Sequence, residues 1–197
     1  MSRLIKSLIL FLSIVCLYGG DKEAPPFKPG AAASFENKLT IDKLTIAAEP
    51  YISDEQAHSA FGKLNPYEYG ILPVLVVMQN DGDKVLRLDR MKVEYVIPGG
   101  DRVEATPAQD VPYTRAPKKP SISYPLPLPK RAPKNPLKKF EIESRAFSAK
   151  MLPPGQSAYG FFYFQAGDRS GSTLYITGIY EASTNRELFY FEVPASR

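Results

Sequence analysis

Residues 69–105 constrain the fold more than any other part of this sequence. Two runs rich in Val, Ile and Leu flank the turn sequence Asn80-Asp81-Gly82-Asp83, and a second turn follows at Pro98-Gly99-Gly100. Apolar, β-branched runs separated by such turns are typical of antiparallel strands joined in sequence. We therefore predict that this stretch is an antiparallel meander in the core of a β-sandwich.

Other segments carry strand patterns as well. Residues 71–79 are apolar without a gap, which predicts a central strand covered on both faces, and 85–97 need a bulge near Asp89-Arg90 to keep one face apolar. In 157–165, Tyr159, Phe161 and Tyr163 alternate with residues of the opposite face. Weaker patterns predict strands at 38–48, 140–142, 173–181 and 187–193.

These segments predict an all-β fold, an immunoglobulin-like antiparallel β-sandwich of about seven strands. One short helix interrupts it at 53–61, where Ser53 is a candidate N-cap and Gly62 ends the helix. A long proline-rich insertion is the second interruption.

The first twenty residues have the plan of a secretory signal peptide. Arg3 and Lys6 precede an apolar run at 8–18, which is about half of the ~20 apolar residues that a membrane-spanning helix needs. We assign 1–20 to a signal peptide, 21–37 to a flexible tether and 38–197 to the folded domain. The mature chain is expected outside the cytosol, in the periplasm or secreted.

Cys16 is the only cysteine, so the mature fold has no disulfide. The sequence Leu12-Ser13-Ile14-Val15-Cys16 resembles the lipobox of bacterial lipoproteins, although Val15 departs from the small residue usual before the cysteine. Lipidation at Cys16 is therefore the minority alternative to a cleaved signal peptide.

The insertion at 112–139 contains eight prolines and no acidic residue. Its proline density favours polyproline II segments, as in Tyr124-Pro-Leu-Pro-Leu-Pro129. Its basic residues are compatible with a solvated loop, and they are also the candidate contact for an anionic partner of the cell envelope. Leu126 and Leu128 are candidates for covering the outward aromatic residues of 157–165. The basic residues are Arg115, Lys118, Lys119, Lys130, Arg131, Lys134, Lys138 and Lys139.

Three stretches carry a resemblance: 70–84, which ends in Asn80-Asp81-Gly82; 152–164, which begins Leu-Pro-Pro-Gly; and the closing segment 187–194. Together they resemble the immunoglobulin-like domain of uncharacterised secreted bacterial proteins and lipoproteins, over about residues 38–194. The resemblance implies a fold and an extracytoplasmic setting, and it carries no activity with it.

The sequence has few residues in the patterns that catalytic or metal sites require. His58 is the only histidine, so a multi-histidine zinc site cannot be built, and no second histidine is available for a Ser-His-Asp triad. Asp81 and Asp83 lack the spacing of a calcium loop and fit a tight turn instead. We expect no catalytic residue, no cofactor and no metal, and we do not expect nucleic acid as a partner.

The sequence therefore predicts a non-enzymatic, exported binding module of the bacterial cell envelope. Its partner would be an envelope protein or an anionic envelope component, bound through a sheet edge or through the basic insertion. The alternative is a structural or accessory subunit that pairs through the edge strand at 187–193. A hydrolase that uses carboxylates is a more distant alternative.

Overall fold

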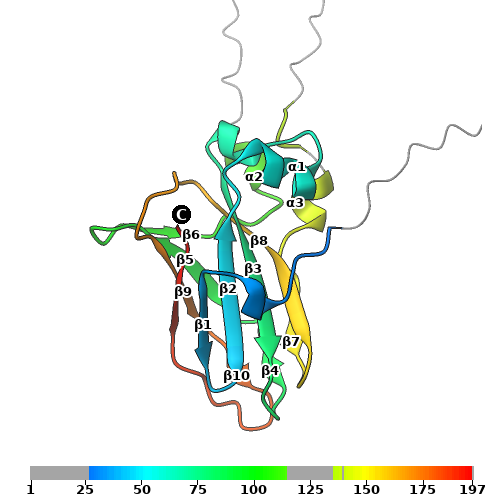
Figure 1. Cartoon of the computed structure of the whole chain (residues 1–197), viewed down its shortest axis with the longest axis vertical. Helices are drawn as coiled ribbons and strands as arrows, with labels where there is room; N and C mark the ends of the chain where they lie inside the picture. The colour runs from blue at the N-terminus through cyan, green and yellow to red at the C-terminus, as the bar shows by residue number, and fades with distance from the viewer. Residues whose placement is uncertain (1–26, 115–134, 139, 197) are drawn as a thin grey trace, which may run out of the picture.

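The computed structural model describes residues 27–114, 135–138 and 140–196 (Figure 1). In this part the chain is mostly β, with eleven strands in three antiparallel sheets and a few short helices. The all-β prediction is confirmed at this level. The strands are β1 (Lys38–Ile41), β2 (Leu44–Pro50), β3 (Leu72–Asn80), β4 (Leu86–Arg87), β5 (Lys92–Val96), β6 (Arg102–Glu104), β7 (Met151–Leu152), β8 (Ser157–Phe164), β9 (Thr173–Thr177), β10 (Tyr180–Glu181) and β11 (Phe191–Pro194).

The three sheets are formed by strands from distant parts of the chain. Sheet 1 has the order β1-β2-β3-β8, sheet 2 the order β11-β9-β5-β6, and the small sheet 3 the order β10-β4-β7. The helices are α1 (Asp54–Phe61), α2 (Val111–Thr114) and α3 (Phe140–Ser144), with 3-10 turns at η1 (Ala32–Ser34) and η2 (Pro66–Tyr69). The three α-helices gather at one end of the molecule (Figure 1).

Strand β3 lies at the centre of the fold, and its side chains are buried on both faces. Val74, Val76 and Met78 point into a core shared with sheets 2 and 3, whereas Leu75 and Val77 point into a second core. This double burial explains the apolar run without polar alternation, because a strand covered on both sides needs no wet face. The prediction for 71–79 is confirmed.

The second core lies between the outer face of sheet 1 and the helical segments. Phe161 and Tyr163 of β8 pack there with Phe61 of α1, and Leu137 and Ile142 from either side of residue 139 cover the same face. Phe162 and Phe164 pack on the opposite face, as the alternation in 157–165 predicts. The predicted cover by Leu126 and Leu128 lies outside the described residues.

Helix α1 begins and ends as predicted. Ser53 accepts a hydrogen bond from the backbone N–H of Gln56, and Gly62 follows the helix with a φ of 65°. A positive φ costs glycine little, which makes it a suitable residue to end a helix. The buried side chains of α1 belong to the second core.

The predicted meander at 69–105 is only half correct. β5 and β6 form the expected hairpin around Gly99-Gly100, but β3 pairs with β2 and β8 and not with β4 or β5. The turn at 80–83 carries the chain from sheet 1 to sheet 3. The Asn80 side chain fixes this crossing, because its amide donates to the carbonyl oxygens of Lys84 and Leu152 and its oxygen accepts from the Gly82 N–H.

Two predicted single strands are each divided in two. Residues 38–48 form a hairpin, β1–β2, whose turn residues Asp42 and Lys43 have φ values of 49° and 64°. Two successive positive φ values are the geometry of a tight type I′ turn, which asparagine and glycine favour, so Asp-Lys gave only a weak signal. Residues 85–97 break near Asp89, and the two halves, β4 and β5, join different sheets.

Three further segments differ from the expected structure. Residues 140–142 were expected to be a strand and are the start of α3. Pro112 was placed in a polyproline stretch and lies in the short helix α2, where its missing N–H falls within the first turn. Residues 27–37, assigned above to the tether, pack against the second core through Phe27, Ala32 and Phe35. Among the described helices, none has the length and apolarity that crossing a membrane requires.

Candidate functional site

The space between sheets 1 and 2 has one closed side and one open side. On the closed side β1 lies beside β11, and the Asn37 side chain donates to the Ser196 carbonyl oxygen at 2.9 Å. On the other side the outer strands are β8 of sheet 1 and β6 of sheet 2, and β6 covers only 94–96 of β5. Residues 92 and 93 of β5, which β6 does not cover, therefore face β8 without a strand between them.

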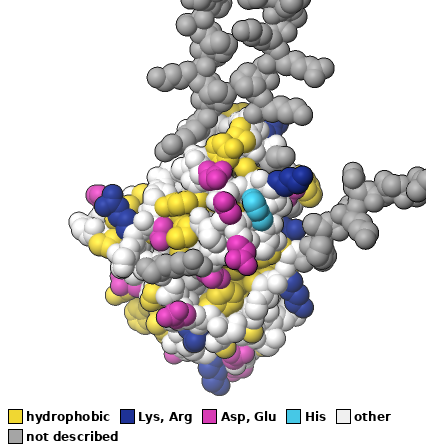
Figure 2. Space-filling model, turned by 45° about the horizontal axis from the view of Figure 1, so that its top comes forward, with side chains coloured by type: hydrophobic (Ala, Val, Ile, Leu, Met, Phe, Trp, Pro, Cys, Tyr) yellow, Lys and Arg dark blue, Asp and Glu magenta, His cyan; other side chains and the backbone are white. Residues whose placement is uncertain are grey.

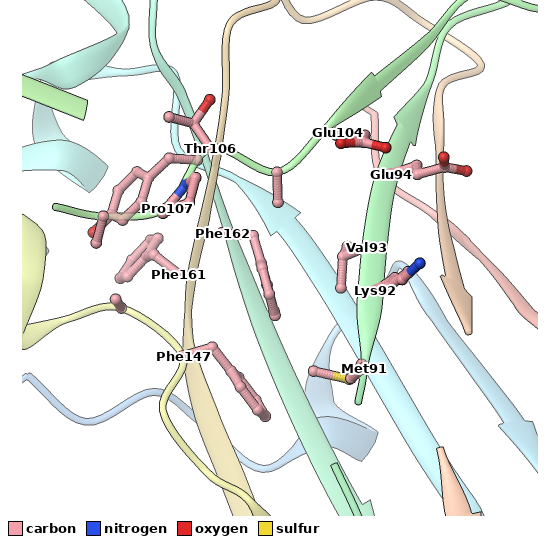
Figure 3. Close-up of a pocket in the computed structure, with 14 residues that line it drawn as sticks. Met91, Lys92, Val93, Glu94, Glu104, Thr106, Pro107, Phe147, Phe161 and Phe162 are labelled. Atoms are coloured by element: carbon pink, nitrogen blue, oxygen red, sulfur yellow. The ribbon is translucent and has the colours of Figure 1, made fainter. Parts of the chain in front are cut away.

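An aromatic groove of about 390 Å³ occupies this open side (Figure 3). We call it the aromatic groove. Phe147 and Phe162 form its apolar floor, and they are faced by Val93 of β5 and by Met91, which directly precedes β5. The complete lining is Met91, Lys92, Val93, Glu94, Glu104, Ala105, Thr106, Pro107, Ala108, Ala146, Phe147, Phe161, Phe162 and Tyr163.

One wall of the groove is the segment 145–147, which runs against the edge of β8. The Phe161 N–H donates to the Arg145 carbonyl oxygen at 2.8 Å, and the Phe147 N–H donates to the Phe161 carbonyl oxygen at 3.1 Å. These bonds hold the Phe147 ring on that of Phe162, with centroids 5.3 Å apart and an angle of 22° between the planes. We call 145–147 the edge segment.

Gly160 allows the edge segment to lie this close to β8. A Cβ atom at position 160 would lie 2.4 Å from the Phe147 Cα and 2.6 Å from the Phe147 N. Atoms cannot approach that closely, so any side chain at this position would displace the backbone of the edge segment. The aromatic groove therefore depends on a glycine in the middle of β8.

The second wall is the segment that follows β6. The Thr106 N–H donates to the Tyr163 carbonyl oxygen at 2.7 Å, and the Ala105 N–H donates to the Val93 carbonyl oxygen at 3.1 Å. This segment bridges the two sheets at the upper end of the groove.

Two carboxylates stand at the rim, on the outer face of sheet 2. Glu94 and Glu104 are directly opposite each other in the β5–β6 ladder, an arrangement of like charges that is unfavourable in isolation. Arg102 relieves part of the repulsion through an ion pair of 2.9 Å with Glu94. Glu104 is exposed and has no ion pair with any described residue, while Lys92 places one positive charge at the same rim.

A second hollow, of about 430 Å³, lies at the end of the molecule near the 80–83 turn. Three acidic residues line it, and one of them, Glu181, is buried and accepts hydrogen bonds from Lys84, Arg186 and Thr184. The bond from Arg186, followed by the bonds from Lys84 and Thr184, lowers the pKa of Glu181 from 4.5 to about 2. Because its carboxylate is fully engaged, we interpret Glu181 as a structural ion-pair centre that ties β10 to the loop after β3.

Of the site candidates that the sequence singled out, those that the structure describes do not line the groove. Lys138 is exposed beside α3, while the other seven basic residues of the insertion and Cys16 lie outside the described residues. His58 is exposed on α1, and Asp81 and Asp83 are exposed in the loop after β3. In the ranges that the structure describes, no group of three His, Cys, Asp or Glu side chains could hold a metal ion.

Sequence reasoning missed the groove because its residues are distant in the chain. The alternation in β8 placed Phe162 on the face opposite Phe161, but it gave no reason to bring Phe147 against it. Gly160, between aromatic neighbours in a strand, was the one available signal, since such a glycine often marks a close backbone approach.

The fold and the groove define a class in structural terms only: an antiparallel β protein whose two main sheets leave one side open above aromatic rings. No protein family model matches the chain, and a search of curated proteins found no match.

Proposed function

We propose that this protein is a non-enzymatic, exported binding module of the bacterial envelope, and that it binds an extended peptide segment of another protein in the aromatic groove. The observation that carries the proposal is the groove itself, with Phe147 and Phe162 stacked at its floor and an unbridged stretch of β5 opposite them. Aromatic side chains are enriched at the cores of interfaces and in the lining of ligand pockets.

The sequence supports the extracytoplasmic setting through its signal-peptide pattern at 1–20, with lipidation at Cys16 as the alternative. Mass spectrometry of the mature N-terminus separates the two, because cleavage leaves an unmodified residue and lipidation leaves an acylated Cys16. The facing sheets and the resemblance of 70–84 and 152–164 support an immunoglobulin-like sandwich as the finer fold assignment. The single histidine and the full engagement of Glu181 support a binding role over hydrolysis.

The experiment is a selection of peptides from a random display library on the mature chain, followed by fluorescence anisotropy with the synthetic peptides. We expect micromolar binding that weakens about tenfold or more in Phe147→Ala, because truncating a central aromatic anchor typically costs more than about 1 kcal/mol of binding energy. Phe189→Ala is the matched control, since Phe189 is 84% exposed and lies outside the groove. Equal binding to the two variants would place the contact elsewhere.

A second candidate is the structural subunit that pairs through the closing strand. Phe189 and Tyr190 are both exposed directly before β11, so an apolar surface does accompany this strand. However, β11 is paired with β9 on one side and lies beside β1 on the other, which leaves little open edge for a partner strand. The Phe189→Ala variant tests this candidate in the same assay, because it would then be the variant that loses binding.

A further inference from the structure

The chemistry of the aromatic groove favours a polyproline II ligand over an added β-strand. Strand addition needs a row of free backbone groups, but both backbone groups of Phe161 and the Tyr163 carbonyl oxygen are already used at the β8 edge. A polyproline II ligand brings few N–H donors and buries its prolines against aromatic rings. The stacked pair of Phe147 and Phe162 offers such a surface.

The chain carries such a ligand in its own sequence. Segment 115–134 has six prolines, six basic residues and no acidic residue, and it includes Tyr124-Pro-Leu-Pro-Leu-Pro129. We propose that segment 115–134 of the same molecule is the ligand of the aromatic groove, bound through the prolines and leucines of 124–129. This inference rests on the proposed function and specifies its ligand class: an outside partner would present a proline-rich, basic sequence that competes with the segment.

The ends of the segment lie near the groove. The groove-lining residue Pro107 accepts a hydrogen bond from the Val111 N–H at the start of α2, and α2 ends at Thr114, one residue before the segment. The Asn135 side chain donates to the Pro112 carbonyl oxygen, so the two ends are held together. The segment therefore leaves and re-enters the fold at one place, beside the upper end of the groove.

The length of the segment is sufficient to reach the floor of the groove. Twenty residues in polyproline II conformation span about 62 Å, so a segment with both ends at one point extends up to about 30 Å from it. The second wall meets β8 at Tyr163. Gly160, beside the edge segment, is three residues away, which is about 10 Å along a strand. The five residues 130–134 alone span about 15 Å, which places 124–129 within reach of Phe147 and Phe162.

Charge also favours the contact. The described residues contain 14 basic and 19 acidic side chains, whereas segment 115–134 is purely basic. Figure 2 shows acidic side chains spread between hydrophobic ones over the end where the helices lie. At the rim of the groove, on the outer face of sheet 2, a cation from the segment would relieve the repulsion between Glu94 and Glu104, and Glu104 has no ion pair among the described side chains.

Limited trypsin digestion of the intact mature chain tests the proposal. Cleavage after Lys130 and Arg131 should be at least tenfold slower than in a synthetic peptide of 115–134, because a bound segment must leave the groove before it is cut. Phe147→Ala and Glu104→Lys should each raise the cleavage rate severalfold. Phe189→Ala and Glu192→Lys are the matched controls, since they make the same changes at exposed positions outside the groove and should leave the rate unchanged.

Several outcomes would overturn the proposal. Wild-type cleavage at the rate of the free peptide would mean that the segment is not bound, and cleavage unaffected by both groove variants would mean that it is bound elsewhere. Protection that grows with protein concentration would identify a second copy as the acceptor. Protection that appears only after vesicles containing anionic phospholipid are added would assign the basic residues to a membrane surface.

A second measurement separates this proposal from the proposed function. The display-selected peptides are titrated into the wild-type chain and into the double variant Leu126→Ser, Leu128→Ser, which keeps the groove intact. We expect at least fivefold tighter binding to the double variant, because its own segment competes less. Equal binding to both chains would refute the segment as ligand while leaving the peptide-binding groove in place, and binding to neither would refute both.

Discussion

Replacing Gly160 by alanine tests whether the edge segment builds the aromatic groove. The new methyl group would lie 2.4 Å from the Phe147 Cα, 2.6 Å from the Phe147 N and 2.9 Å from the Ala146 carbonyl carbon, and all three are backbone atoms. A flexible side chain cannot move aside to relieve this overlap, so the edge segment itself must shift away from β8. The substitution should therefore act on stability and on the groove together.

The cost follows from the contacts that the shift removes. The two backbone hydrogen bonds between the edge segment and Phe161 contribute about 1 kcal/mol each, and the stack of Phe147 on Phe162 contributes about 1 kcal/mol. We expect Gly160→Ala to lower the free energy of unfolding by about 3 kcal/mol. This is a large change for adding one methyl group, because protein stabilities are typically about 5–15 kcal/mol.

Urea unfolding provides the measurement, followed by tyrosine fluorescence because the chain has no tryptophan. Gly167→Ala is the matched control: its Cβ would meet only the Tyr67 hydroxyl at 3.9 Å, and we expect a change within about 0.5 kcal/mol. The double variant Gly160→Ala, Phe147→Ala should not recover stability, since the overlap is with backbone atoms. Wild-type stability of Gly160→Ala, or rescue by Phe147→Ala, would refute this reasoning.

Two other predictions concern single polar side chains. Tyr163→Phe should lower the free energy of unfolding by about 1–2 kcal/mol in the same urea assay, because the buried Tyr163 hydroxyl donates to the Ile142 carbonyl oxygen at 2.7 Å and the variant leaves that oxygen without its donor. For Glu181, the ion pairs with Lys84 and Arg186 stabilise only the charged carboxylate, and its pKa is about 2 in the folded state against an ordinary 4.5. This contribution is present above pH 4.5 and is lost as the pH falls toward 2, so Glu181→Gln should flatten the dependence of the urea midpoint on pH in that range.

Both predictions have matched controls. Tyr159→Phe removes a hydroxyl whose bond to the Phe27 carbonyl oxygen is exposed, so its effect should stay below about 0.5 kcal/mol. Glu192→Gln removes an exposed carboxylate with no ion pair among the described residues. It should leave the fall of the urea midpoint between pH 4.5 and 2 as in the wild type. If Tyr163→Phe and Tyr159→Phe had equal effects, burial of the Tyr163 hydroxyl would not explain its contribution. If Glu181→Gln and Glu192→Gln had equal effects, the ion pairs of Glu181 would not explain the pH dependence.

The sequence predicted those parts of the fold that depend on local pattern. The run at 71–79 and the alternation in 157–165 gave the right strands and the right faces, and Ser53 and Gly62 gave both ends of α1. These features follow from neighbours within a few residues, where period and capping chemistry decide. The same holds for the β5–β6 hairpin, whose glycines at 99 and 100 have positive φ.

Strand pairing could not be predicted in the same way. The turn at 80–83 looks like a hairpin, but Asn80 binds the Leu152 carbonyl oxygen from a segment more than seventy residues away, and this contact sends the chain to another sheet. Residues 140–142 contain alternating apolar residues, yet they begin helix α3, from which Ile142 packs into the second core beside residues of β3, α1 and β8. Non-local contacts of this kind have no signature in a single sequence.

The asymmetry of the two sides explains why a groove exists where it does. β1 and β11 meet directly, so their side of the core is closed by side chains that the alternating pattern already supplies. On the opposite side β6 is only three residues long, and the edge of β8 is bonded to the edge segment. No strand of either sheet therefore closes this side. A protein that only needed stability could close this side with apolar side chains. Here two aromatic rings are left partly exposed near the opposed carboxylates of the rim, which costs stability and leaves the surface on which we propose that the proline-rich, basic segment binds.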